Sequence, residues 1–340
     1  MKFVRFLLFP FTLLYDVITS IRNYLFDKRI LSSTSFSVPV IVVGNLSVGG
    51  TGKTPQIEYL TRLLKKNHRV AILSRGYGRK TKGFFKVTAT DNVINVGDEP
   101  LQYAKKFKDV IVAVDENRVE GIKKLFAFKE SPNVVLLDDA FQHRKVKAKI
   151  SILLTKYNDL YVDDFLLPTG NLREGKKGYK RADVIIVTKC PLDVNKEWQQ
   201  KVVKKLNPKQ YQQLFFTGIS YGKDLKGYQK IPIKNLKEYK VLLITGIANP
   251  KPLTKFLKEK GVRFTHLKFP DHHSFSPKNI KKIKETFVNF SASKKIILTT
   301  EKDYVRLCNS IKKLHYLEIE TLFLDNQQNK FDALINKQIY

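Results

Sequence analysis

Short apolar runs separated by amphipathic stretches recur along most of the chain, and this pattern predicts strands that alternate with helices. Continuous apolar runs of this length are typical of parallel strands buried on both faces. Strands are predicted at 40–43, 70–73, 86–89, 110–114, 134–137, 150–154, 184–187, 241–245, 264–267 and 296–299, and helices at 56–65, 118–125, 251–260, 277–289 and from Gly97 onward. The order of these elements predicts an α/β fold with a doubly wound, mostly parallel sheet.

The texture of the sequence changes near Tyr221, and this change indicates a boundary between two domains. A chain of 340 residues is long enough for two domains. Residues 32–221 hold the first group of predicted strands, residues 222–240 are rich in lysine and poor in apolar residues, and residues 241–340 hold a shorter second group. We therefore expect a P-loop-type larger domain, a linker and a second, smaller α/β domain.

Residues 1–31 form a separate N-terminal segment that is apolar almost throughout. Its longest run without a charged residue has ten residues, about half of what a membrane-spanning helix requires. No small-residue cleavage site is obvious, so a signal peptide is not predicted. The main polar positions fall on one narrow stripe of an amphipathic helix; they are Arg5, Thr12, Asp16, Ser20 and Asn23.

Two interpretations of this N-terminal helix remain open. It can pack on the domain as part of the core, or it can lie in a membrane interface. We favour the interface, because basic residues that can meet anionic headgroups flank the apolar part. These residues are Lys2, Arg5, Arg22, Lys28 and Arg29.

The stretch VPVIVVGNLSVGGTGKTP, residues 38–55, combines a buried strand, a glycine-rich turn and the start of a helix. This order is what binding a nucleoside triphosphate requires, because converging backbone N–H groups and a helix N-terminus bind phosphate oxygens. Lys53 can reach the β- and γ-phosphates, and the hydroxyl of Thr54 can bind Mg²⁺. Ser47 stands where the usual pattern has its first glycine. The nucleotide-binding residues of the loop are expected to be Gly49, Gly50, Thr51, Gly52, Lys53 and Thr54.

Two adjacent carboxylates, Asp138 and Asp139, follow the predicted strand 134–137. Nucleotide-hydrolysing folds place an aspartate here to hold Mg²⁺ directly or through water. Capping of a turn is the alternative, and the glycine-rich loop upstream favours the metal role. The nucleotide is expected to be ATP, because Thr188-Lys189 begins the guanine-specific pattern [NT]-K-x-D but Pro191 occupies the position of its aspartate.

A second group of polar residues lies at 271–273, in the smaller domain, where the sequence reads Asp-His-His. Consecutive side chains rarely converge on one metal ion, and the pattern H-E-x-x-H is absent. A histidine that is paired with a carboxylate for proton transfer is the favoured interpretation.

Further polar side chains follow the strand ends of the larger domain. Gln142 and His143 could orient a substrate or its phosphates, or they could belong to a solvated loop. Arg118, and Arg173 with its neighbour Glu174, could bind phosphates as bidentate clamps, although each alone is more often a surface charge.

The formal net charge of +31 favours polyanionic partners such as nucleic acid, an anionic membrane or a phosphorylated substrate. A general lysine bias of the source proteome would also contribute to it. No RNP-like motif, RGG tract or zinc finger is present, so nucleic acid is not expected as a partner. Two cysteines, Cys190 and Cys308, are too few for a disulfide framework and fit a reducing compartment.

Eight motifs occur in a specific order, and the resemblance that they carry covers roughly residues 37–303: GNLSVGGTGKTP, SRGYGR, GDEP, DDAFQHR, PTGNLREG, TGIANP, FPDHHSF and TTEKD. Together they resemble the tetraacyldisaccharide 4′-kinases, and Ser47 agrees with the variant phosphate loop of that family. The resemblance implies ATP- and Mg²⁺-dependent phosphorylation of the 4′-hydroxyl of a tetraacylated disaccharide 1-phosphate, which gives lipid IVA. It also implies a monomeric, peripheral protein at the cytoplasmic face of the inner membrane.

The resemblance further implies roles for individual residues. Lys53 would hold the phosphates, Asp98 of GDEP would accept the proton of the sugar hydroxyl, and His272 would pair with Asp98 across the domain cleft. Asp138 and Asp139, with Thr54, would serve the metal. The substrate side of the site would be lined by Arg75, Arg118, Gln142, His143, Arg173 and Glu174. The rival interpretations are a membrane-recruited P-loop ATPase or switch without a lipid acceptor, and a kinase for another polyprenyl or sugar acceptor.

Overall fold

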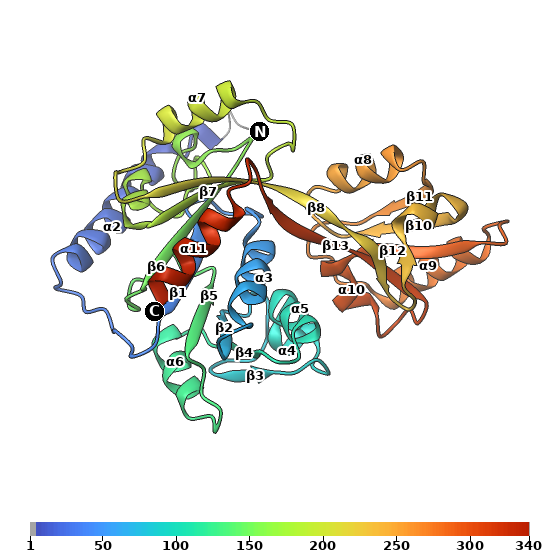
Figure 1. Cartoon of the computed structure of the whole chain (residues 1–340), viewed down its shortest axis with the longest axis horizontal. Coiled ribbons are helices and arrows are strands. Elements are labelled where there is room, and N and C mark those ends of the chain that lie inside the picture. Colours follow the sequence, from blue (N-terminus) through green and yellow to red (C-terminus); the bar gives the residue numbers. More distant parts are fainter. Residues whose placement is uncertain (1–4, 340) are drawn as a thin grey trace.

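The computed structural model describes residues 5–339 and shows two lobes joined by a pair of long strands (Figure 1). The strands are β1 (Val40–Asn45), β2 (Val70–Ser74), β3 (Phe85–Val87), β4 (Ile111–Val114), β5 (Val134–Asp138), β6 (Ile150–Lys156), β7 (Val184–Thr188), β8 (Gln213–Gly227), β9 (Ile231–Pro232), β10 (Lys240–Thr245), β11 (Arg263–Lys268), β12 (Lys295–Thr300) and β13 (Leu314–Phe323). The helices are α2 (Phe9–Asp27), α3 (Lys53–Leu64), α4 (Val93–Val96), α5 (Asp98–Lys106), α6 (Arg118–Phe126), α7 (Lys196–Leu206), α8 (Lys251–Glu259), α9 (Pro277–Val288), α10 (Glu301–Leu307) and α11 (Gln328–Ile339), with 3₁₀ turns η1 (Tyr161–Asp163), η2 (Lys176–Arg181) and η3 (Ile233–Glu238).

The larger lobe is built on a mostly parallel sheet with the strand order β8-β7-β6-β1-β5-β2-β4-β3. Alternate residues of β1 enter different cores, because successive side chains of a strand point to opposite faces. Ile41 and Val43 pack into one apolar cluster, and Val40 and Val42 into another on the other face. Burial on both faces explains why these strands are continuous apolar runs, and the predicted doubly wound α/β fold is confirmed.

The smaller lobe has the strand order β11-β10-β12-β13, and it continues into the larger lobe through β8. The first part of β8 pairs with β7 in parallel, and the rest pairs with β13 in the antiparallel sense. The region 222–240 is therefore occupied by the end of β8, by β9 and by η3. Figure 1 shows β8 and β13 crossing between the lobes as a two-stranded ribbon.

The last helix, α11, returns to the larger lobe. Phe331 and Ile335 are fully buried there, in the cluster that also holds Phe215 and Phe323. The hydroxyl of Tyr59, in α3, donates to Asp332 at 2.6 Å. The placement of α11 differs from the sequence expectation, which assigned all of 241–340 to the smaller domain. The difference arises because a lone amphipathic helix carries no local signal for the sheet face that will cover it.

Helix α2 lies on the larger lobe by its polar stripe, and its apolar side faces outward. Thr12 is buried and shares a 2.7 Å hydrogen bond with Thr169, and Asn23 donates to Glu174 at 2.9 Å. Eleven large apolar side chains of this helix and its flank are exposed: Phe6, Leu7, Leu8, Phe9, Phe11, Leu13, Leu14, Val17, Ile18, Ile21 and Tyr24. The helix thus packs on the lobe mainly through Thr12, Thr19 and Phe26, and most of its apolar face is not part of the core.

The first four residues of the N-terminal segment, including Lys2, lie outside the described residues. Between residues 5 and 339, no helix has the length and apolar character needed to cross a membrane.

Candidate active site

The phosphate loop connects β1 to α3 and is shaped by two glycines. Gly49 and Gly52 have φ of 99° and 87°, in the left-handed region where a side chain is strained. Gly52 is the N-cap of α3, so Lys53 and Thr54 form the first turn of that helix. The free N–H groups of this turn and the positive end of the helix dipole therefore face the loop, as phosphate binding requires.

Two side chains at the end of β7 bind the backbone of this loop. The hydroxyl of Thr188 donates to the carbonyl of Thr51 at 2.7 Å. The ammonium of Lys189 donates to the carbonyl of Gly50 at 2.6 Å. These side chains bind the carbonyl groups of Gly50 and Thr51, so the N–H groups of the loop are left to donate to a ligand.

The ammonium of Lys53 points to the acidic end of β5. It lies 3.6 Å from a carboxylate oxygen of Asp139 and donates to the side chain of Asn45 at 3.3 Å. Arg173 donates to the same Asp139 oxygen at 2.8 Å. Burial raises the pKa of Asp139, but Lys53 and Arg173 outweigh it, so the net pKa of this carboxyl is lowered. Asp139 is therefore an anionic bridge between the phosphate loop and the loop of Arg173.

Asp138 has a different environment from its neighbour. Its Oδ1 atom is buried and has no hydrogen-bond partner, and its Oδ2 accepts only long bonds of 3.4 Å from Ser74 and Tyr103. Burial, together with the carboxylates of Glu99 and Asp139, raises the pKa of Asp138 to about 7. A buried carboxylate oxygen without a partner suits a cation ligand.

The residues present fit a magnesium ion that is held mainly by nucleotide phosphates. Among residues 5–339, no three acidic, histidine or cysteine side chains converge as a metal-ligand group. Mg²⁺ commonly binds proteins through one or two carboxylates and takes its other ligands from phosphates and water. Asp138 and the hydroxyl of Thr54 are sufficient for such a site.

The catalytic pair expected from the family resemblance is assembled across the two lobes. Asp98 begins α5 in the larger lobe, and its Oδ2 lies 3.0 Å from Nδ1 of His272, which follows β11 in the smaller lobe. Gly97 precedes Asp98 with φ of 90°, and a side chain there would lie 3.1 Å from the carbonyl of Tyr77. The absence of a side chain thus lets the loop after β2 approach Asp98.

The second nitrogen of the His272 ring has a partner in the smaller lobe. Nε2 lies 2.9 Å from the ammonium of Lys302. Asp98 and Lys302 therefore contact the two nitrogens of the ring and fix its orientation.

Several residues expected to contact substrate have protein partners here. Arg118 is only 3% exposed, and its guanidinium donates to the backbone carbonyl of Asp115 at 2.9 Å. Glu174 is 2% exposed and accepts from Asn23, Gln142 and Arg181. These contacts order the loops that frame the site.

Arg75 and His143 differ from that pair. Arg75 is exposed at the end of β2. Burial, and then the charge of Arg118, lowers the pKa of His143 to about 4, so its ring is neutral. Its Nε2 atom is buried without a hydrogen-bond partner. Of the predicted substrate residues, Arg75 therefore offers a charge to solvent, and His143 offers an unpaired ring nitrogen.

Known proteins resemble this chain over nearly its whole length. A family model described as tetraacyldisaccharide-1-P 4′-kinase matches residues 4–340. The chain belongs to this kinase family. The tetraacyldisaccharide 4′-kinase of Flavobacterium johnsoniae is 52% identical over 342 residues, which cover 100% of this chain and 98% of that protein. The tetraacyldisaccharide 4′-kinase of Bacteroides thetaiotaomicron is 46% identical, covering 96% of this chain and 91% of that protein.

A solved structure supports the same assignment. The crystal structure of LpxK from Aquifex aeolicus in complex with ATP superposes with a TM-score of 0.80 at 34% sequence identity. The match covers 99% of this chain and 100% of that one. The family resemblance expected from the ordered motifs is therefore confirmed.

Two residues at the kinase site have no role in the sequence analysis, although the TTEKD motif points to their helix. Arg306, in α10, donates from Nε to Oδ1 of Asp98 at 2.8 Å and from Nη2 to Oδ2. Its Nη2 also lies 3.2 Å from Nδ1 of His272. Lys302, one turn earlier in α10, contacts Nε2 of His272, the ring nitrogen that faces away from Asp98. Lys302 belongs to the TTEKD motif, but for Arg306 the sequence offered only a charge four residues further on, which is common on any helix.

The bidentate contact from Arg306 predicts a change in the pH profile. Burial raises the pKa of Asp98, but hydrogen bonds from Arg306 and His272 outweigh it, and Lys302 also lowers the pKa. Arg306→Met should raise the pKa of Asp98, so the acid limb of kcat/KM should move to higher pH. Rates of the wild type and the variant across pH 4–9 measure this shift. Arg263→Met, which changes an exposed arginine of the same lobe, should leave the limb in place.

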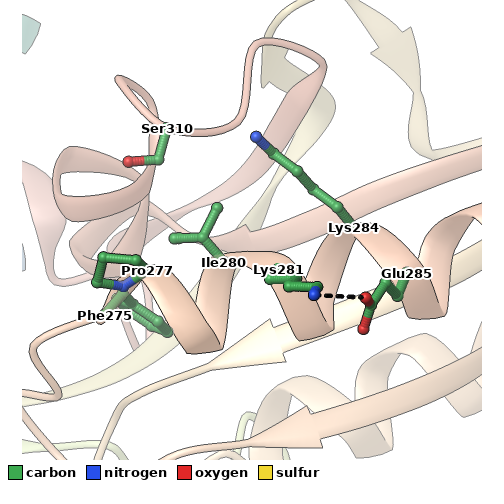
Figure 2. A pocket seen from close by; sticks show the side chains of 7 residues that line it. All are labelled: Phe275, Pro277, Ile280, Lys281, Lys284, Glu285 and Ser310. Carbon is green, nitrogen blue, oxygen red and sulfur yellow. Dashed lines mark ion pairs between the residues drawn. The ribbon is translucent and has the colours of Figure 1, made fainter.

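Figure 2 shows a hollow that is lined by residues of α9, by Phe275 just before it and by Ser310. It contains none of the predicted site residues, and its one ion pair, between Lys281 and Glu285, is exposed. Its lining residues are Phe275, Pro277, Ile280, Lys281, Lys284, Glu285 and Ser310.

Proposed function

We propose that this chain transfers the γ-phosphoryl group of ATP to the 4′-hydroxyl of a tetraacylated disaccharide 1-phosphate, the reaction that gives lipid IVA in lipid A biosynthesis. Membership of the kinase family over residues 4–340 supports the reaction. The observation that carries the proposal is the 3.0 Å contact of Asp98 with His272, which pairs a carboxylate of the larger lobe with a histidine of the smaller lobe. A P-loop switch has no use for such a pair.

Each residue has a separate task in the proposed reaction. Lys53 and the loop N–H groups bind the phosphates and stabilise the charge that develops on the transferred group. Asp98 accepts the proton of the sugar hydroxyl, and His272 orients Asp98 through the contact between Nδ1 and Oδ2. When bound, Mg²⁺ neutralises phosphate charge. Asp138 and Thr54 are its proposed protein ligands, and Asp139 keeps Lys53 and Arg173 in place.

The kinase assay separates the proposed reaction from simple ATP hydrolysis. Purified protein is incubated with γ-labelled ATP, Mg²⁺ and the disaccharide 1-phosphate in detergent micelles, and label is counted in the lipid fraction and in free phosphate. The kinase reaction places label in the lipid. Release of label as free phosphate alone, at the same rate with and without lipid, would support the ATPase alternative.

The outward apolar face of α2 supports a further part of the proposal: this protein binds the cytoplasmic face of the inner membrane as a peripheral protein. A contiguous apolar face on a helix that is already docked by its polar stripe leaves a surface for lipid. Arg22 and Lys28 flank this face, and the overall charge favours anionic headgroups. The acceptor is an acylated lipid, so a bilayer contact brings the site to its substrate. A monomer suffices for this arrangement.

Three substitutions on the apolar face test the membrane proposal. In the full-length chain, Leu14→Glu, Ile18→Glu and Ile21→Glu together should abolish sedimentation with vesicles of phosphatidylglycerol and phosphatidylethanolamine. All three side chains are exposed, so the fold should be unaffected. Val288→Glu, on an exposed apolar residue of α9, is the matched control. Unchanged vesicle binding of the triple variant would contradict the proposal. These substitutions test the apolar face alone. A deletion of residues 1–25 would also remove the contacts of Thr12 with Thr169 and of Asn23 with Glu174.

A further inference from the structure

Helices α5 and α10 come from different lobes and face each other with opposite charges at both ends. Asp98, the first residue of α5, meets Arg306 near the end of α10. Lys106, the last residue of α5, meets Glu301, the first residue of α10, at 2.9 Å. The two helices therefore run antiparallel, and each carries its acid at the N-terminus and its cation near the C-terminus, where the helix dipole favours them. We refer to the four residues Asp98, Lys106, Glu301 and Arg306 as the charge clasp.

The Lys106 end of the clasp is a buried junction of several elements. Its ammonium contacts Glu58 at 2.6 Å, Glu301 at 2.9 Å and Glu318 at 2.9 Å. These residues belong to the phosphate-loop helix α3, to α10 and to the connecting strand β13. The side chain of Lys106 is 10% exposed, and that of Glu58 is 1% exposed. One cation therefore joins the phosphate-loop helix, the smaller lobe and the connection between the lobes.

The charges that face Lys106 keep it protonated. Burial lowers its pKa, but the carboxylates of Glu58, Glu301 and Glu318 raise it more. Lys226, from β8, supplies a second cation to Glu318. Burial and the nearby Glu58 raise the pKa of Glu301. Without Lys106, the carboxylates of Glu58, Glu301 and Glu318 would lie close together with no cation between them. Burying such uncompensated charges strongly destabilises the folded state.

We propose that Lys106 is a positioning residue for phosphoryl transfer, which sets the alignment of α10 on α5 and so places His272, Lys302 and Arg306 against Asp98. The two ends of α5 are about 12 Å apart, so Lys106 cannot touch the reacting atoms itself. A misplacement of about 1 Å at a reacting group can lower a rate on the order of 10²-fold. This inference rests on the proposed role of Asp98 and adds a remote residue on which that role depends.

The experiment is a double-mutant cycle on the full-length protein. Lys106→Met should lower kcat by about 10- to 100-fold with little change in the KM for ATP, and Lys106→Arg should restore much of the rate. In the Asp98→Asn background, Lys106→Met should lower kcat by less than about twofold, because the pair that it positions is already disabled. Lys65→Met removes an exposed ion pair with Asp109 just past the end of α3 and should change neither constant.

Glu301→Leu covers the case in which Lys106→Met does not fold. It removes the contact of α10 with Lys106 but leaves that lysine bonded to Glu58 and Glu318, and it relieves crowding among the three carboxylates. It should lower kcat in the same way and lose its effect in the Asp98→Asn background. Wild-type kcat in either folded variant, or an equal loss with and without Asp98, would overturn the proposal. Full activity of Asp98→Asn by itself would instead overturn the role given to Asp98.

Discussion

Lys53→Ala is expected to lower kcat by about 10³-fold or more, the largest effect of any single substitution in the chain. Phosphoryl transfer gains most from positioning and from neutralising charge on the transferred group, and Lys53 is the cation in the first turn of α3 that can reach it. Label transfer from ATP to the lipid acceptor measures the effect. Loss of Lys53 also removes a charge partner of Asp139, so the melting temperature should be recorded with the rate.

Lys65, the residue that follows the last residue of α3, provides a matched control for this substitution. Lys65→Met changes a half-buried lysine that is paired with the exposed Asp109, and the kinase rate should stay near that of the wild type. If Lys53→Ala retained more than about a tenth of the wild-type rate, the loop would not be the site of the γ-phosphate.

Asp98→Asn is expected to lower kcat by about 10²–10⁴-fold, the range that a positioned base contributes, with little change in the KM for ATP. The asparagine keeps the shape of the side chain and its contact to His272 but cannot accept the sugar proton. Rates at saturating ATP with varied lipid, and at saturating lipid with varied ATP, separate the two constants. Asp109→Asn, on an exposed carboxylate, should leave both constants unchanged.

The opposite kinetic pattern would assign a different role to Asp98. A large rise in the KM for ATP with kcat intact would make it a nucleotide-binding residue rather than a base. Equal loss of lipid phosphorylation and of lipid-independent ATP hydrolysis would point to a defect in the phosphate loop. The two constants and the two activities together thus separate the base from its alternatives.

The strands of the larger lobe were predictable because both of their faces are buried. Continuous apolar runs such as 134–137 leave few alternatives to a central parallel strand, and the observed β5 differs by one residue. The second half of β8, which includes Lys223 and Lys226, was missed because it pairs with β13 in a partly exposed ribbon. A strand with solvent-exposed faces tolerates charged side chains, so its sequence resembles that of a linker.

Short helices at domain contacts were also missed. Helix α10 has only seven residues, and its N-cap Thr300 is also the last residue of β12, so too few positions exist for a periodic pattern. Yet this helix carries Lys302, which contacts His272, and Arg306, which contacts Asp98. Its contribution to the site depends on packing against α5, which no local pattern records.

The sequence by itself determined the phosphate loop, because that site is built from consecutive residues whose glycines, lysine and threonine dictate the local backbone. It also determined the polar stripe of the N-terminal helix, but the tertiary structure decided that this stripe faces the protein and that the apolar side faces outward. The contacts of Asp98 with His272 and Arg306 join residues 174 and 208 positions apart. Such pairs are set by how two lobes pack, and spacing along the chain has no physical connection to that geometry.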